Sequence, residues 1–358
     1  MCDPIIGTCL SMCPKEERLL REQEGLLNRL EIDESTKHLK YPKADPAKII
    51  KCYKRSGAGV LMNEPSELRP GPVLLLTLKY LFTKVLTRKD IGWSAIYEFT
   101  FDRIRAIRQD MIVQRLDVAM NIMLLEPIVK FHIYAAERMC EKSSSEFVSK
   151  FNEEHLLECL KVLLVKYDER DTDDKSHNNY VLVMKKFSRL TMCDHRAQIE
   201  ALYILNYLGN EAALDRGLSL PAKYKNTPEV KAALKISLAW YMNNYIRVCR
   251  EISQLSPLFA MAALSNLKCI RRSVLQIMSS GYNCKNNPYN MNDLKNILLY
   301  NNMERITIDC ALYGIKFDNN NNIYFQKAQF NGVNMLAHPE KHLSDSVLDE
   351  LLPDILFN

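Results

Sequence analysis

Glycine is scarce in this chain, which has only 11 glycines among 358 residues. Loops that cradle phosphate groups need glycines close together, and neither a P-loop nor a Gly-x-Gly-x-x-Gly motif occurs. The hydrolase signatures His-Glu-x-x-His and Gly-x-Ser-x-Gly are also missing. We therefore expect a protein that is not an enzyme, with no catalytic residues, no cofactor and no small-molecule substrate.

Long apolar runs are missing as well. The longest, residues 73–82, is interrupted by Lys79 and is far shorter than the roughly 20 residues that cross a bilayer. The N-terminus has no basic stretch leading into a long apolar segment. We expect no membrane contact and no secretion.

Cysteine is present in an odd number, eleven, and most of these residues fall in segments with helical periodicity. This pattern is unlike the loop-rich framework of a disulfide-bonded secreted domain. We expect reduced, mostly buried thiols in a protein of the nucleus and cytoplasm.

Strand-type alternation is missing from most of the chain. Apolar residues recur with helical period in the segments 73–86, 93–116, 118–140, 153–167, 177–190, 194–208, 229–242 and 244–280, the last with a break near Pro257. Short polar connections favour stacked helix hairpins. We predict an all-α fold in which residues 73–256 form irregular, TPR- or PCI-like helical repeats.

The segments on either side differ from this region. Residues 1–72 hold seven of the fourteen prolines and are predicted to form an extended arm with one helix at 15–30. Within 257–330, two short helices (289–300 and 302–313) precede an Asn-rich hairpin at 315–326, which is the order of a winged helix. Residues 331–358 form an acidic tail.

The most distinctive string is GTCLSMCPKEER, residues 7–18. Cys9 and Cys13, with Cys2 upstream, raise the question of a metal site, but the spacing is not Cys-x-x-Cys and no second pair lies nearby. We favour a structural role without metal, in which Pro14 starts a helix while Met12 and Cys13 fill an apolar pocket.

This string resembles the Met-Cys-Pro signature of the Sac-three/GANP family. Six further segments resemble that family in order: DPAKIIKCYKRSGAG (45–59), LRPGPVLLLTLKYL (68–81), FTFDRIRAIRQDMIVQ (99–114), LEPIVKFHIY (125–134), HRAQIEALYIL (195–205) and VKAALKISLAWYMNNYIR (230–247). The resemblance implies helical repeats joined to a PCI-type winged helix. It also implies a scaffold that binds a PCI-domain subunit and a small acidic subunit.

The resemblance implies two cellular roles. The long family form is a scaffold of the nuclear transcription and mRNA-export complex, and the short form is linked to centrosome duplication, spindle assembly and mitotic progression. No glycine follows a phenylalanine here, and only about 28 residues follow the hairpin. We therefore favour the short form at the centrosome and spindle, with mRNA export as the alternative.

One segment, FDRIRAIRQD, resembles a catalytic site because it concentrates Asp102, Arg103, Arg105, Arg108 and Asp110 on one helix. We expect a structural role instead, in which the arginines hydrogen-bond neighbouring segments. Asp102 and Arg105 are three residues apart and are predicted to pair along the helix.

A basic block is the second group of candidate residues. Residues 223–295 contain eleven Lys/Arg against three Asp/Glu, a net charge of +8. We predict that Lys268, Arg271 and Arg272 share one exposed helix face, with Arg247 and Arg250 on the preceding helix. Two interpretations remain open: contact with an acidic partner, or non-specific binding to RNA or DNA phosphates.

Base-specific reading is not expected. The second short helix, which would enter a DNA groove in a winged helix, offers Glu304, Arg305 and Asp309. This mixture of charges disfavours contact with base edges. Any nucleic-acid binding is therefore expected to be directed to the backbone.

Overall fold

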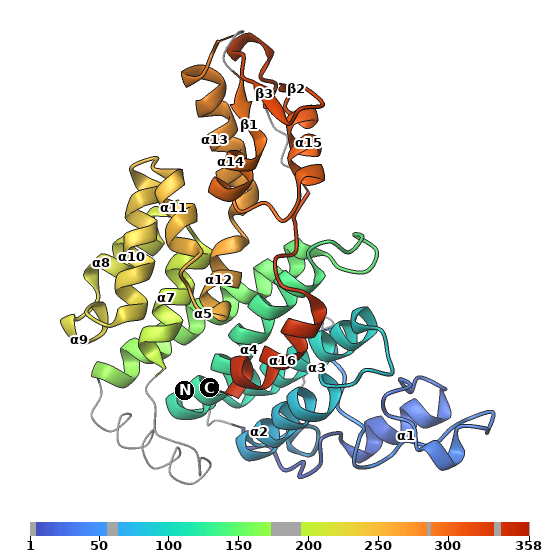
Figure 1. The fold of residues 1–358 in the computed structure, drawn as a ribbon. Helices are drawn as coiled ribbons and strands as arrows, with labels where there is room; N and C mark the ends of the chain where they lie inside the picture. The colour runs from blue at the N-terminus through green and yellow to red at the C-terminus, as the bar shows by residue number, and fades with distance from the viewer. Residues whose placement is uncertain (1–4, 56–63, 173–194, 285–287, 333–337, 358) are drawn as a thin grey trace. The chain divides into compact units, whose positions relative to one another are not determined.

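The computed structural model describes residues 5–55, 64–172, 195–284, 288–332 and 338–357 (Figure 1). These residues are predominantly helical, which confirms the all-α prediction. They form two compact units: residues 5–55, 64–131, 157–172 and 349–357 make the first, and residues 132–156, 195–284, 288–332 and 338–348 make the second. The predicted helix at 177–190 lies outside the described residues.

The first unit contains the N-terminal arm and the helices next to it. These are α1 (Lys15–Gln23), α2 (Gly71–Tyr80), the π-helical turn η3 (Leu81–Val85), α3 (Trp93–Gln114), and parts of α4 (Val118–Met139), α5 (Ser149–Thr172) and α16 (Asp345–Phe357). Short 3-10 turns at Glu34–Thr36 and Pro65–Glu67 interrupt the arm. The arm is therefore largely irregular, as its prolines predict.

Helix α1 is shorter than predicted. It ends at Gln23, and Gly25 follows with a φ of +66°, a conformation that glycine adopts without steric cost. The leucines beyond it therefore do not extend the helix. Leu27 instead packs against a small buried cluster of Cys13, Ala44 and Ile49.

Aromatic side chains form part of the core of the first unit. The ring of Phe131 on α4 stacks on Phe82 with centroids 5.7 Å apart and on Tyr97 at 6.1 Å. Helix α4 is long and apolar enough to cross a bilayer, but 83% of its most apolar window is buried inside the protein. Such burial is typical of a core helix.

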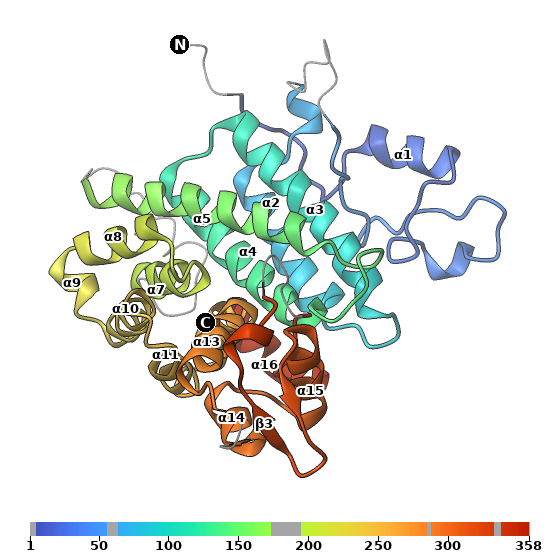
Figure 2. The same ribbon diagram turned by 90° about the horizontal axis from the view of Figure 1, so that it is seen from above.

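The second unit contains a series of shorter helices. These are α7 (Arg196–Asn206), α8 (Glu211–Ser219), α9 (Ala222–Lys225), α10 (Pro228–Tyr241), α11 (Tyr245–Ile252), α12 (Pro257–Leu264) and α13 (Leu267–Gly281). Helix α10 packs against α7, α8 and α11 (Figure 2). The segment 244–280 therefore forms three helices, with the expected break before Pro257 and a second one at Ser265 and Asn266.

Asparagine starts several of these helices. The side chains of Asn210, Asn244, Asn290 and Asn302 each accept a hydrogen bond from a backbone N–H in the first turn of the helix that follows. Each cap satisfies a donor that has no partner within the helix. Helix α8, which the apolar periodicity did not predict, begins at such a cap.

The end of the second unit combines helices with a small sheet. Helix α13 is followed by β1 (Tyr289–Asn290), α14 (Met291–Ile297), α15 (Met303–Leu312), β2 (Lys316–Phe317) and β3 (Asn322–Tyr324). The antiparallel strands have the order β1-β3-β2, and Ile323 pairs with both Tyr289 and Phe317. The predicted hairpin is confirmed. We refer to residues 267–324 as the C-terminal module.

Candidate functional site

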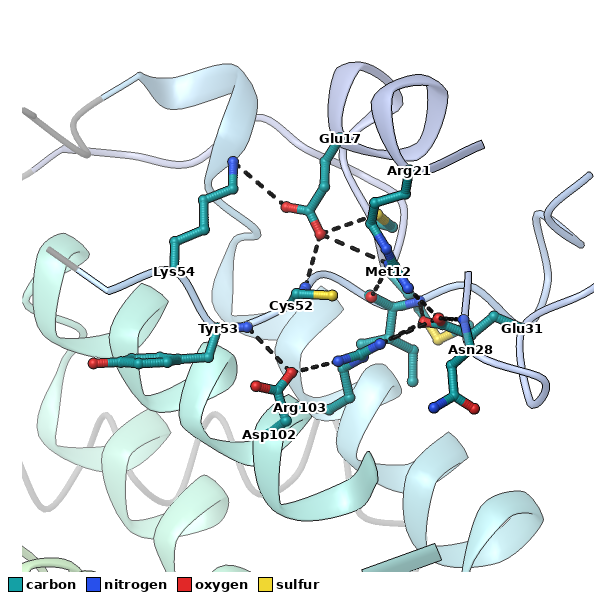
Figure 3. Close-up of polar contacts among 12 residues, drawn as sticks. Met12, Glu17, Arg21, Asn28, Glu31, Cys52, Tyr53, Lys54, Asp102 and Arg103 are labelled. Atoms are coloured by element: carbon teal, nitrogen blue, oxygen red, sulfur yellow. Dashed lines mark hydrogen bonds and ion pairs between the residues drawn. The ribbon is translucent and has the colours of Figure 1, made fainter. Parts of the chain in front are cut away.

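A buried carboxylate, Glu31, joins the N-terminal arm to α3 (Figure 3). Its oxygens accept hydrogen bonds from Ile50 N at 3.0 Å, from Asn28 N at 3.3 Å and from Arg103 Nη2 at 3.1 Å. Arg21 Nη2 donates to the same carboxylate. Two arginines and two backbone amides therefore surround this fully buried charge.

Glu17 on α1 extends this network along the arm. Its Oε1 accepts from Cys52 N at 2.8 Å, and its Oε2 lies 3.5 Å from Lys54 Nζ. Arg21, one turn later, lies 3.8 Å from Glu17, and its Nη1 donates to Ile50 O at 3.1 Å. Helix α1 is thus tied to the returning segment of the arm by both charge and backbone contacts.

Helix α3 contributes one face of side chains to the same network. Asp102 accepts from Tyr53 N at 3.3 Å and pairs with the neighbouring Arg103. The Arg103 guanidinium also lies over the Phe99 ring at 4.4 Å, and Arg105 lies over the Tyr53 ring at 3.7 Å. The predicted pairing of Asp102 with Arg105 is therefore wrong, because Arg105 stacks on the arm.

A second buried carboxylate, Asp110, lies two turns further along α3. Its Oδ1 accepts from Lys51 Nζ at 2.7 Å, and its Oδ2 accepts from Arg69 Nε at 2.7 Å. The side chains of Asp110 and Arg69 have no exposed area. Arg69 Nη1 also donates to Met12 O at 3.3 Å, so this centre reaches the Met-Cys-Pro string.

Gln114, at the end of α3, fixes the start of the arm. Its Nε2 donates to Arg69 O at 2.8 Å, and its Oε1 accepts from Gly7 N at 2.9 Å. Cys9 N donates to Leu68 O at 3.0 Å. A Cβ on Gly7 would lie 2.4 Å from Leu68 O, so only glycine fits this close approach.

Two thiols of the arm, those of Cys13 and Cys52, are unsuited to nucleophilic chemistry. Burial raises the pKa of the Cys13 thiol, and it raises the pKa of Cys52 to about 11. Across the described residues, no group of three His, Cys, Asp or Glu side chains is arranged to hold a metal ion. Cys2 lies outside those residues.

The charges in this network are balanced. We call it the arm network and define it by five acids (Glu17, Glu31, Glu67, Asp102, Asp110) and five cations (Arg21, Lys51, Lys54, Arg69, Arg103). Removing one member of a buried pair leaves an unpaired charge and is strongly destabilising. The arrangement is suited to holding the arm in one register on α3.

The sequence identified only part of the arm network and of the other contacts between the arm and α3. Cys9, Met12, Cys13 and Pro14 lie in the arm, and Asp102, Arg103, Arg105 and Asp110 face it from α3. Arg108 differs, because its guanidinium lies 2.9 Å from Glu158 on α5. Sequence reasoning missed Arg21, Glu31, Lys51, Arg69 and Gln114.

The predicted basic surface is not continuous. Arg271 is only 3% exposed: its Nε and Nη2 donate to the carbonyls of Leu298 and Leu299 at 3.1 and 2.6 Å, and its Nη1 lies 2.7 Å from Glu340. The prediction that it shares an outer face with Lys268 and Arg272 is wrong, because helical spacing cannot tell which cation turns inward.

The other four residues of the basic block are accessible to different degrees. Lys268 and Arg272 are half-buried, whereas Arg247 and Arg250 on α11 are exposed. Within the described part of the chain, neither Arg247 nor Arg250 forms an ion pair. Only these two cations of the predicted set therefore combine full exposure with uncompensated charge.

Comparison with known proteins gives a family match. Residues 12–319 match the sequence profile of the SAC3/GANP family. The chain is 26% identical over 336 residues to SAC3 family protein 1 of Schizosaccharomyces pombe, which covers 88% of this chain and 30% of that protein. It is also 30% identical over 246 residues to Protein xmas of Drosophila melanogaster, covering 67% of this chain and 11% of that protein.

A plant protein is similar too. SAC3 family protein B of Arabidopsis thaliana is 27% identical over 283 residues, which cover 77% of this chain and 16% of that protein. The chain thus spans less than a third of the length of these curated relatives. The matched profile begins at Met12 and includes the arm network.

Proposed function

Because this chain belongs to the SAC3/GANP family, we propose that it is a non-enzymatic scaffold that assembles with PCI-type protein partners. The observation that carries the proposal is a group of exposed apolar side chains at the turn between α10 and α11. Tyr241 is 69% exposed, Met242 75% and Ile246 46%. Exposed apolar side chains that lie this close together in the chain are typical of protein–protein contacts.

We further propose that the C-terminal module is a PCI-type winged helix. Its element order, with α14 and α15 between β1 and a β2–β3 hairpin, supports this assignment, as does the strand order β1-β3-β2. On this proposal α15 corresponds to the recognition helix, which enters the major groove in winged-helix proteins that bind DNA.

The exposed side chains of the module favour a protein partner over base recognition. Ile308 on α15 is 45% exposed, and Phe317 on β2 is 42% exposed. Arg305, the one cation on α15, donates to the carbonyl oxygens of His338 and Pro339. The helix therefore offers apolar surface and the acid Glu304, which suit a PCI-domain subunit better than a base edge.

Co-purification of the tagged 358-residue chain from dividing cells tests the scaffold proposal. We expect a PCI-domain protein and a small acidic protein to be enriched with the wild-type chain. Changing Ile308→Asp on α15, or Tyr241→Asp with Met242→Asp at the turn, should lose a partner because a charge is placed in an apolar contact. Thr87→Asp, an exposed change in the first unit, is the matched control. Recovery of no PCI-domain protein with the wild-type chain would contradict the proposal.

Two cellular roles follow from the family resemblance, and we propose the centrosome and spindle role first. On this role the scaffold acts in centrosome duplication and mitotic progression, with the chain distributed between nucleus and cytoplasm. The alternative is mRNA export. Enrichment of centrosomal proteins supports the first role and enrichment of export factors supports the second, and imaging of the tagged chain through mitosis separates the two.

Backbone-directed binding of RNA or DNA is a second candidate activity. It is favoured by Arg247 and Arg250, whose exposed guanidinium groups lie three residues apart on α11. We expect weak, salt-dependent binding to single-stranded RNA that falls in an Arg247→Glu, Arg250→Glu double variant. Binding that is equal for wild-type and variant proteins at every salt concentration would exclude this surface.

A further inference from the structure

An extended segment, residues 338–345, follows the C-terminal module and leads into α16; we call it the strap. Its carbonyl oxygens accept hydrogen bonds from the module. Arg305 Nη2 donates to His338 O and to Pro339 O, the latter at 2.8 Å, and Asn301 Nδ2 donates to Lys341 O at 2.7 Å. The module thus presents side-chain donors to three of the four carbonyls of residues 338–341.

Glu340 anchors the strap in the module. Its Oε2 lies 2.7 Å from Arg271 Nη1, its Oε1 accepts from Asn301 N at 3.1 Å, and its side chain is only 5% exposed. The Arg271 guanidinium is held in place by the Leu298 and Leu299 carbonyls and lies over the Tyr300 ring at 3.7 Å. It is therefore a preorganised receptor for one carboxylate.

Acceptors line the opposite side of the strap. Glu141 on the segment after α4 accepts from Lys341 N at 3.0 Å, and Glu137 on α4 accepts from His342 N at 2.6 Å and from Leu343 N at 3.1 Å. Together with the donors Arg271, Asn301 and Arg305, these acceptors form what we call the strap groove. The groove forms hydrogen bonds with both the N–H and the C=O groups of an extended polypeptide.

This pattern discriminates between classes of ligand. A nucleic-acid backbone offers phosphate acceptors but no row of amide donors, so the carboxylates of Glu137 and Glu141 would repel it. A peptide satisfies both sides of the groove. A pocket of about 80 Å³ next to the strap, lined in part by Cys140, Leu264 and Lys268, leaves room for a larger side chain than the strap supplies.

We propose that the strap groove recognises an extended peptide segment of a partner protein with one acidic anchor residue, and that the strap is its intramolecular occupant. The incoming segment needs a carboxylate in the position of Glu340 and free backbone amides in the next three positions. Recognition by main-chain hydrogen bonds with one side-chain anchor is a common mode of peptide binding. This proposal rests on the scaffold function, since it requires a partner that displaces the strap.

Binding of a separate synthetic peptide to the 358-residue chain tests the proposal. Glu340→Ala removes the anchor of the strap and leaves every groove residue intact. A fluorescent synthetic peptide with the sequence of residues 337–346 is titrated into the Glu340→Ala and wild-type proteins. We expect at least about tenfold tighter binding to the variant, because the tethered wild-type strap competes at high effective concentration.

Three controls make the result specific. Glu350→Ala, an exposed change of the same type in α16, should bind the peptide as weakly as wild type. A peptide with Ala in place of Glu340 should lose binding to the Glu340→Ala protein. Adding Arg305→Ala to that protein should also weaken capture, because the donor to the His338 and Pro339 carbonyls is removed.

Hydrogen exchange gives an independent readout of strap release. The amides of Lys341, His342 and Leu343 should exchange faster in Glu340→Ala than in Glu350→Ala. Unchanged protection would overturn Glu340 as the anchor, and faster exchange without peptide capture would overturn the groove as a peptide site. Tighter binding of a single-stranded oligonucleotide of about 20 nucleotides than of the peptide would assign the groove to nucleic acid instead. Because these assays use purified protein, they remain separate from recovery of a PCI-domain partner.

Discussion

Arg69 Nε donates to Asp110 Oδ2 at 2.7 Å, and neither side chain has exposed area. The two residues are 41 positions apart, one in the proline-rich arm and the other on α3. Lys51 reaches the same carboxylate from a third position, again at 2.7 Å. A single carboxylate thus fixes two separate segments of the arm on one helix.

Replacing Asp110 with Asn should destabilise the protein strongly. The change leaves Lys51 and Arg69 buried without their counter-charge, and breaking a buried pair of this kind costs about 3–5 kcal/mol. Urea denaturation followed by circular dichroism measures the effect. Glu34→Gln is the control, because its pair with Lys37 is exposed and worth at most about 0.5 kcal/mol. Equal urea denaturation midpoints for the two variants would show that the Asp110 charge does not stabilise the protein.

Glu31→Gln should loosen the arm while α3 stays folded. The amide keeps an acceptor for Ile50 N but loses the charge that holds Arg21 and Arg103. We expect faster hydrogen exchange at Ile50 and Cys52 and earlier proteolytic cleavage between residues 24 and 50, with little change in α3. Glu24→Gln, an exposed change just after α1, should behave as wild type. Uniformly faster exchange through α3 would contradict a local role for Glu31.

Periodicity predicted the helices because it reports which face of a segment is buried. It could not predict the arm network, since Glu31 and Arg69 lie in irregular segments where no repeat marks a buried position. The FDRIRAIRQD string contributes Asp102 and Arg103 to the arm network, yet Asp102 pairs with Arg103 and not with Arg105. Pairing of buried charges depends on segments that are distant in sequence, and local spacing does not contain that information.

The basic block shows that local spacing also fails to identify buried charges on a regular helix. Lys268, Arg271 and Arg272 have the spacing of a shared face, but Arg271 is buried by the turn before α15 and by Glu340. A long cationic side chain next to an apolar stripe can point either way. The segments that pack against the helix decide whether the side chain points inward or outward.

Gly209→Ala should destabilise the second unit. Gly209 has a φ of +85°, and an added Cβ would lie 2.6 Å from Trp240 Nε1 on α10. The backbone penalty and the displacement of the indole together should cost about 2–4 kcal/mol. Gly25→Ala is the matched control, because its φ is +66° but nothing lies within 4 Å of the added atom. It should show only the backbone penalty, about 1–2 kcal/mol. Equal losses in urea denaturation would exclude the contact with Trp240.

Acidification should lower the free energy of unfolding through protonation of His342 in the unfolded chain. Burial, with the nearby Arg271 charge, lowers the pKa of His342 from 6.5 to about 4. The unfolded chain therefore binds this proton below pH 6.5 whereas the folded chain excludes it until about pH 4. The stability that His342 contributes is complete above pH 6.5 and is lost as the pH falls, by about 2 kcal/mol at pH 5.

Comparison with His342→Gln isolates this effect. Burial also raises the pKa of Glu137, and a raised carboxylate pKa favours the folded state as the pH falls, so wild-type data alone combine two opposite trends. Both proteins contain Glu137, and the difference in their free energies of unfolding removes its contribution. That difference should shift by about 2 kcal/mol toward the variant between pH 7 and pH 5. A pH-independent difference for His342→Gln would mean that the folded protein admits a proton on His342, and that the strap is open to solvent at this residue.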